Sequence, residues 1–124
     1  YTRKEMLHKI RGGGGASAYL NTRDFRDVCS KMNAGDALAR RVFDAMAYQV
    51  SREIGAAAVS AGGPDAIVLT GGMANSRELV EAISERVSFL GPIYVYPGEE
   101  ELEALNDYLV LAERGEITPM SYGE

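Results

Sequence analysis

The chain has 124 residues, of which 46% are hydrophobic, a composition typical of one globular domain that excludes a disordered chain. Thirteen basic against eighteen acidic residues give a formal net charge of -5. This balance argues against nucleic acid and against a membrane surface as partners, because both attract basic patches. The single cysteine excludes an internal disulfide and predicts a cytoplasmic location. No apolar run reaches the ~18 residues of a membrane-spanning helix.

The first half of the chain is expected to be helical, with one glycine-rich break. Residues 2–10 carry apolar side chains at helical spacing, and the glycines at 12–15 end this helix and open a loop. Asp24 is expected to cap a short helix that runs to Lys31. The longest predicted helix covers residues 36–60. Its apolar stripe comprises Leu38, Val42, Met46, Val50, Ile54 and Ala58, and it is widened by Phe43 and Ala47.

Two strand–turn–helix units are expected in the second half. Residues 66–69 and 93–96 are short apolar runs typical of buried strands, and helices are predicted at 76–88 and 99–113, the first of them capped by Asn75. This order predicts two parallel strands joined by a right-handed crossover. Two strands are too few for an independent sheet, so we expect the remaining strands to lie in sequence missing from the N-terminal side.

The turn after the first strand contains two adjacent glycines, Gly71 and Gly72. Glycines in this position let the backbone pass close to a planar ligand, and the following helix N-terminus favours an anionic or polar one. An ordinary strand-to-helix turn would also contain glycines. The residues of the turn alone do not separate these interpretations.

The turn after the second strand leads into three glutamates, Glu99, Glu100 and Glu101. Glutamates in the first turn of a helix complement its dipole without any further function. Alternatively, one of them holds Mg²⁺ beside a nucleotide phosphate. Both turns follow strands that are expected to be parallel, and ligands of such sheets bind at the carboxyl ends of the strands.

Asp24, Phe25 and Arg26 place a carboxylate, an aromatic face and a guanidinium on one short segment. These groups suit a ribose, a purine ring, and a phosphate or ring edge, respectively. The alternative is structural, with Asp24 as a helix cap, Phe25 in the core and Arg26 in solvent. Cys29 is expected to be a small core residue.

Taken in order, several segments resemble the C-terminal part of the butyrate kinases, in the acetate kinase group of the actin-like ATPase and sugar kinase superfamily. The matching segments run in the family order and cover nearly the whole chain. They are Gly14–Asp24, Ala45–Gln49, Glu53–Ala56, Asp65–Ala74, Glu85–Phe89 and Val95–Glu101.

The resemblance implies an α/β fold, namely a partial, helix-rich ribonuclease H-like (actin-like ATPase) domain with few parallel strands. Residues 1–124 would form a single, incomplete C-terminal nucleotide-binding domain with a loose tail at 115–124. The family transfers the γ-phosphoryl group of ATP reversibly to a short-chain carboxylate such as butyrate, giving ADP and an acyl phosphate. The resemblance therefore implies ATP/ADP and Mg²⁺ as cofactors, and a homodimer that the helix over 36–60 could serve.

The resemblance also implies which residues would bind the nucleotide. Glu100 or Glu101 would approach the metal, with the register uncertain by one residue. The residues expected at the adenosine are Asp24, Phe25, Arg26, Gly71, Gly72, Met73 and Ala74.

Two departures from the family pattern matter. The family usually has Gly and Asn where this chain has Asn21 and Arg23; Asn21 is expected to keep the left-handed turn, and Arg23 adds a charge near the nucleotide. The N-terminal domain, with its phosphate-binding motif and the catalytic arginine and histidine, has no counterpart here. We therefore expect no catalytic residue in this chain and no activity from the chain alone. The alternatives are a non-catalytic nucleotide-binding or dimerisation module derived from the family, and a ligand-free structural remnant.

Overall fold

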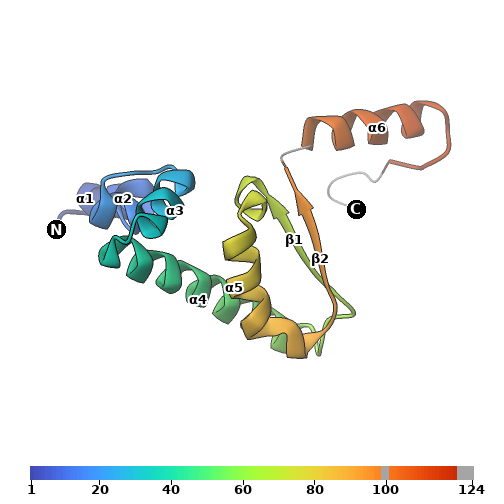
Figure 1. Cartoon of the computed structure of the whole chain (residues 1–124). Helices are drawn as coiled ribbons and strands as arrows, with labels where there is room; N and C mark the ends of the chain where they lie inside the picture. The colour runs from blue at the N-terminus through green and yellow to red at the C-terminus, as the bar shows by residue number, and fades with distance from the viewer. Residues whose placement is uncertain (99–100, 120–124) are drawn as a thin grey trace.

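The computed structural model describes residues 1–98 and 101–119 and contains a helical half followed by a small parallel sheet with its connecting helix (Figure 1). Short helices gather at one end of the long helix α4, and α5 packs beside its other half (Figure 1). The elements of the first half are α1 (Arg3–His8), the π-helix η1 (Lys9–Gly13), α2 (Ala16–Leu20), α3 (Phe25–Asn33) and α4 (Ala37–Ser60). Those of the second half are β1 (Ile67–Gly71), η2 (Gly72–Asn75), α5 (Arg77–Val87), η3 (Ser88–Leu90), β2 (Ile93–Pro97) and α6 (Glu101–Glu113).

The predicted elements are confirmed to within a few residues, and one α-helix, α2, was not predicted. The glycine-rich segment is shorter than expected, because the chain continues from α1 through the wide turn of η1 and then forms α2. Asn21 ends α2 in the left-handed conformation, with φ 52° and ψ 35°, as the sequence predicts for this position. The cap of α5 was predicted wrongly at Asn75. Ser76 is the N-cap, and its hydroxyl accepts a hydrogen bond from the backbone N–H of Leu79.

Helix α4 is the longest of the described helices, and its buried face agrees with the predicted stripe at Val42, Phe43, Ala47 and Ala58. Leu38 and Val50, at predicted stripe positions, are exposed, whereas Ala39, which was not predicted in the stripe, is buried. The buried positions carry small side chains next to one large ring, which lets α3 and α5 approach the α4 backbone closely. Alanine gives a weak hydrophobic signal in a sequence, and Ala39 was therefore not assigned to the stripe.

One hydrophobic core joins the helices to the inner face of the sheet. Ile67 of β1 is buried in this core, and Leu69 and Ile93 pack against it. The other buried members come from α2, α3, α4 and α5: Leu20, Val28, Met32, Ala39, Val42, Phe43, Ala47, Leu79, Ile83 and Val87.

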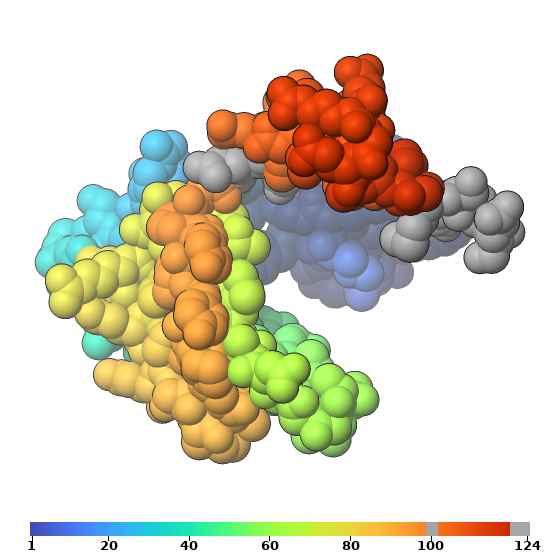
Figure 2. All heavy atoms as spheres, turned by 90° about the vertical axis from the view of Figure 1, so that its right-hand side faces the viewer, coloured from blue at the N-terminus to red at the C-terminus, as the bar shows by residue number. Residues whose placement is uncertain are grey.

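β1 and β2 pair in parallel, in a register that runs from Ile67 opposite Ile93 to Gly71 opposite Pro97. Within the described ranges these two strands are the whole sheet, which confirms the predicted parallel pair. The outer face is exposed at Val68, Tyr94 and Tyr96. β2 runs uncovered along the surface in Figure 2, and α6 stands apart from the sheet in both views.

The structure describes only the first part of the predicted tail at 115–124. Residues 120–124 lie outside the described ranges, whereas Glu116 donates its backbone N–H to the carbonyl of Leu111 and so extends the end of α6. Among the described helices, none combines the length and the apolar character that crossing a bilayer requires.

Candidate functional site

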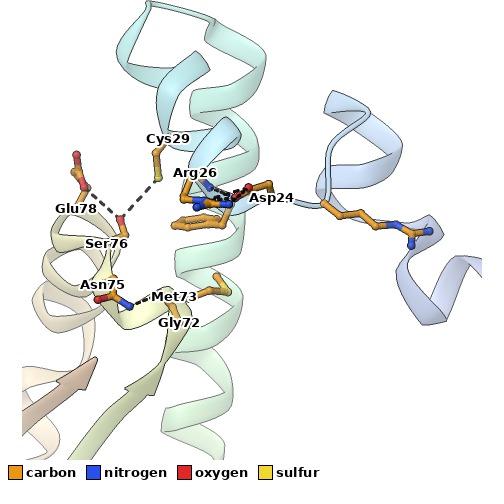
Figure 3. A pocket seen from close by; sticks show the side chains of 10 residues that line it. Asp24, Arg26, Cys29, Gly72, Met73, Asn75, Ser76 and Glu78 are labelled. Atoms are coloured by element: carbon orange, nitrogen blue, oxygen red, sulfur yellow. Dashed lines mark hydrogen bonds and ion pairs between the residues drawn. The ribbon is translucent and has the colours of Figure 1, made fainter. Parts of the chain in front are cut away.

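An open cavity of about 1210 Å³ lies between the start of α3 and the start of α5 (Figure 3). One wall comes from the α2–α3 connection and α3, the other from η2 and α5. Two segments that are far apart in the sequence therefore meet around one space. The lining residues are Arg23, Asp24, Phe25, Arg26, Cys29, Gly72, Met73, Asn75, Ser76 and Glu78.

Asp24 and Arg26 form the polar part of the first wall. The Asp24 carboxylate caps α3 by accepting the backbone N–H of Arg26 at 2.9 Å, and it also accepts the Arg26 Nε–H at 3.0 Å. The Arg26 side-chain hydrogen bond is the main cause that lowers the pKa of Asp24 from 3.8 to about 2, and the backbone hydrogen bond adds to it. The structural role predicted for Asp24 as a cap is thus confirmed, and the same residue faces the cavity.

Asp24 is expected to remain ionised far into acid. Because its pKa is depressed in the folded chain, the stability that its interactions contribute is complete above pH 3.8 and is lost as the pH falls toward 2. An NMR titration of the Asp24 side-chain carboxyl should give a midpoint near the lower value. Arg26→Gln should move this midpoint back toward 3.8. A midpoint that the substitution leaves unchanged would contradict the assigned cause.

Phe25 connects this wall to the core. Its ring stacks on Phe43 of α4, with 5.9 Å between the ring centroids and 21° between the planes. Phe25 is only partly buried, so its ring forms part of the cavity wall and also packs against Phe43 in the core. Arg26 is exposed, with 90% of its side chain accessible.

The second wall is polar and held by local hydrogen bonds. The Asn75 side-chain amide donates to the carbonyl oxygen of Gly72 at 3.0 Å, which fixes the η2 turn. The Ser76 hydroxyl donates to the Glu78 carboxylate at 3.2 Å. The backbone N–H of Glu78 and this hydroxyl hold the pKa of the Glu78 carboxyl below its usual value. Cys29 reaches across from α3, with its Sγ 3.8 Å from the Ser76 Oγ (Figure 3).

Five of the seven residues predicted at the adenosine line this cavity: Asp24, Phe25, Arg26, Gly72 and Met73. The other two face elsewhere. Gly71 is the last residue of β1, with φ 85° and ψ 174°. Ala74 lines a smaller, apolar hollow of about 350 Å³ between α4, β1 and α5.

Sequence reasoning did not assign Cys29, Asn75, Ser76 or Glu78 to the site. Cys29 was expected in the core, and Asn75 and Glu78 were expected only as parts of a helix cap. The helix caps were the sequence feature that could have indicated these site residues, because the cavity lies where two capped helices, α3 and α5, begin. Only the packing of α3 and α5 against α4 shows that these two starts are neighbours.

The predicted metal ligands are not placed by the structure. Glu100 lies outside the described residues, and the Glu101 side chain is not described, although α6 begins at this residue. Among the described residues, no group of three or more histidine, cysteine, aspartate or glutamate side chains could hold a metal ion. Asp24 is already engaged by Arg26.

Comparison with known proteins places the chain in a family. The ROK family model matches residues 10–91, a range that includes both walls of the cavity. The chain belongs to the ROK family. This membership and the parallel strands confirm the predicted fold class, a partial, helix-rich actin-like ATPase domain.

Two curated relatives are similar over most of the chain. A protein named probable butyrate kinase 2, from Caldanaerobacter subterraneus subsp. tengcongensis, is 49% identical over 124 residues, which are 99% of this chain and 35% of the relative. A probable butyrate kinase from Listeria innocua is 48% identical over 107 residues, which are 86% of this chain and 30% of the relative. These matches confirm the resemblance to butyrate kinases. The chain spans about a third of the length of these relatives.

Proposed function

We propose that this chain supplies the adenosine half of a nucleotide site in a butyrate kinase-like phosphotransferase. The whole enzyme would move the γ-phosphoryl group of ATP to a short-chain carboxylate such as butyrate, reversibly, in the cytoplasm. The names of the two relatives and the membership of the ROK family support this proposal. Residues 1–124 would be the C-terminal nucleotide-binding domain of that enzyme.

The observation that carries the proposal is the meeting of two segments around one cavity. Residues 24–26 and residues 72–73 were selected from the sequence for different reasons, and they line the same space. The cavity offers an aromatic ring, Phe25, a guanidinium, Arg26, and the carboxylate of Asp24, which suit a base, a polar edge and a ribose. The absent side chain of Gly72 leaves room for a flat ligand beside the η2 turn.

We expect the half-site to bind nucleotide without catalysing phosphoryl transfer. Phosphoryl transfer depends on positioning and on charge stabilisation from several elements at once, and the proposed half-site is only one of them. In the proposal, the catalytic residues and the carboxylate site belong to the parts of the enzyme that correspond to the rest of the relatives' length. α4 would contribute to a homodimer. Glu100 or Glu101 would approach Mg²⁺.

Calorimetric titration of Mg·ADP into the 124-residue chain tests the half-site. We expect saturable binding, and more than tenfold weaker binding in Gly72→Val, because the new side chain would occupy the cavity. Gly72 is not among the glycines with a positive φ, so a side chain there meets no left-handed backbone. Absence of binding in the parent chain would overturn the proposal that this chain holds a nucleotide half-site.

A matched control separates the cavity from the fold. Gly55 lies in α4 away from the cavity, and a Cβ at this position meets nothing within 4 Å. Gly55→Val should therefore bind Mg·ADP like the parent chain, and circular dichroism should show the same helical content in both variants. Equal losses in the two variants would show that the effect is not local to the η2 turn.

A turnover assay distinguishes the half-site from a complete enzyme. The chain alone, with ATP, Mg²⁺ and butyrate, should form no acyl phosphate. Detectable acyl phosphate would contradict the assignment of the catalytic residues to other parts of the protein. The alternative, a non-catalytic module derived from the family, also predicts that the chain alone binds nucleotide without turnover. The two hypotheses differ for a chain that is completed with the rest of a relative's sequence. The half-site predicts turnover by that longer protein, and the non-catalytic module predicts none.

A further inference from the structure

The cavity has one arginine whose charge is not neutralised by a described neighbour. Arg26 is paired with Asp24, whose carboxylate accepts its Nε–H at 3.0 Å. Arg23 lines the same cavity and is exposed, and it forms no ion pair with any residue in the described ranges. The positive charge that the cavity presents to a ligand therefore comes mainly from Arg23.

The Arg23 guanidinium lies beside the glycine-rich segment. A Cβ added to Gly12 would lie 3.8 Å from the Arg23 Cζ and 3.9 Å from its Nε. The side chain thus lies against the end of η1, where Gly12 presents backbone without a side chain. A group bound by Arg23 would sit beside this segment, on the side of the cavity formed by the α2–α3 connection.

The opposite wall carries a negative charge. Glu78 is near the start of α5, and the Ser76 hydroxyl donates to its carboxylate, which favours the ionised form. A phosphate is repelled by this wall and attracted to Arg23, since like charges in one site oppose each other. The charges of the cavity therefore favour one orientation for a ligand that is anionic at one end.

We propose that Arg23 binds the phosphate groups of a nucleoside polyphosphate, whose base then lies toward Asn75 and Ser76. This inference rests on the proposed nucleotide site and adds to it a residue that distinguishes a phosphorylated ligand from a nucleoside. A guanidinium suits this role, because it donates several hydrogen bonds to phosphate oxygens in a planar arrangement.

Two ligands and one substitution test the inference by calorimetry. In Arg23→Asn, we expect Mg·ADP to bind about tenfold more weakly, the size of one charge-assisted hydrogen bond. Adenosine has no phosphate, so its affinity should stay within about twofold of that of the parent chain. Arg23→Lys keeps the charge and should retain part of the affinity for Mg·ADP.

Arg41→Asn is the matched control. Arg41 is exposed on α4, does not line the cavity and forms no ion pair with a described residue, so its substitution removes the same charge elsewhere. It should leave the binding of both ligands unchanged. If Arg41→Asn weakened Mg·ADP binding as much as Arg23→Asn, the effect would come from net charge and the inference would be overturned.

The remaining outcomes separate the inference from the proposed function. If Arg23→Asn left Mg·ADP binding unchanged, or weakened adenosine and Mg·ADP equally, Arg23 would not be a phosphate contact although the nucleotide site would stand. If the parent chain bound neither ligand, the nucleotide site itself would fail, and the role of Arg23 with it.

Discussion

Phe43→Ala is expected to lower the free energy of unfolding by about 3–5 kcal/mol, the usual cost of removing a large aromatic ring from a packed core. Phe43 is 3% exposed and lies on the face of α4 that packs against the other helices. Its removal leaves a cavity that neighbouring alanines at 39 and 47 cannot fill. Chemical unfolding followed by circular dichroism measures the change.

The same substitution should also weaken nucleotide binding, because Phe43 supports the ring of Phe25 at the cavity wall. Phe89→Ala provides the control, since Phe89 is 81% exposed and its removal should change stability by less than about 0.5 kcal/mol. Similar losses in the two variants would mean that the α3–α4 core does not have the packing described here. Unchanged Mg·ADP affinity in a folded Phe43→Ala chain would argue against Phe25 as part of the site.

Local signals in the sequence were sufficient for most of the elements. Asp36 illustrates why: its carboxylate accepts the backbone N–H groups of Leu38 and Ala39 at 2.8 and 3.0 Å, so the start of α4 is determined by one side chain and the residues next to it. The two strands were recognisable because short runs of β-branched and aromatic residues stand between glycines and prolines. Such features act over a few residues and are visible without a structure.

The backbone around the glycine-rich segment could not be predicted in the same way. A Cβ on Gly13 would meet the ring of His8 at 2.7 Å, and a Cβ on Gly14 would meet the carbonyl oxygen of Lys9 at 2.8 Å. These glycines are required because the turn of η1 folds back on its own helix, not because the segment is an open loop. Glycines permit many conformations, so their presence predicts a special backbone without saying which one.

The cavity shows a different limit of prediction from the sequence. Asp24 and Ser76 each begin a helix; Asp24 was predicted as a cap, whereas Asn75 was predicted in the place of Ser76. Their common cavity depends on α3 and α5 packing against different parts of α4, which no local pattern contains. The family resemblance supplied the link for residues 24–26 and 72–73. It did not supply Ser76, nor Glu78, which was predicted only as part of a helix cap.

Adjacent glycines in the β1–η2 turn are expected to respond differently to substitution. Gly71 has φ 85° and ψ 174°, a region that residues with a Cβ almost never occupy, so Gly71→Ala should cost about 1–3 kcal/mol of stability. The reason is the backbone, since a Cβ at Gly71 would meet nothing within 4 Å. Gly72 has no such φ, and Gly72→Ala should change stability by less than about 0.5 kcal/mol.

The effects of the two substitutions on Mg·ADP binding should be the reverse of their effects on stability. Gly72 lines the cavity and Gly71 does not, so Gly72→Ala should weaken Mg·ADP binding in a chain that remains as stable as the parent. Gly71→Ala should bind normally under conditions where it is folded. Urea unfolding and calorimetry on the same two variants provide both measurements. If Gly71→Ala were stable and defective in binding, the positive φ would not be a structural requirement of this turn, and the ligand would approach the other glycine.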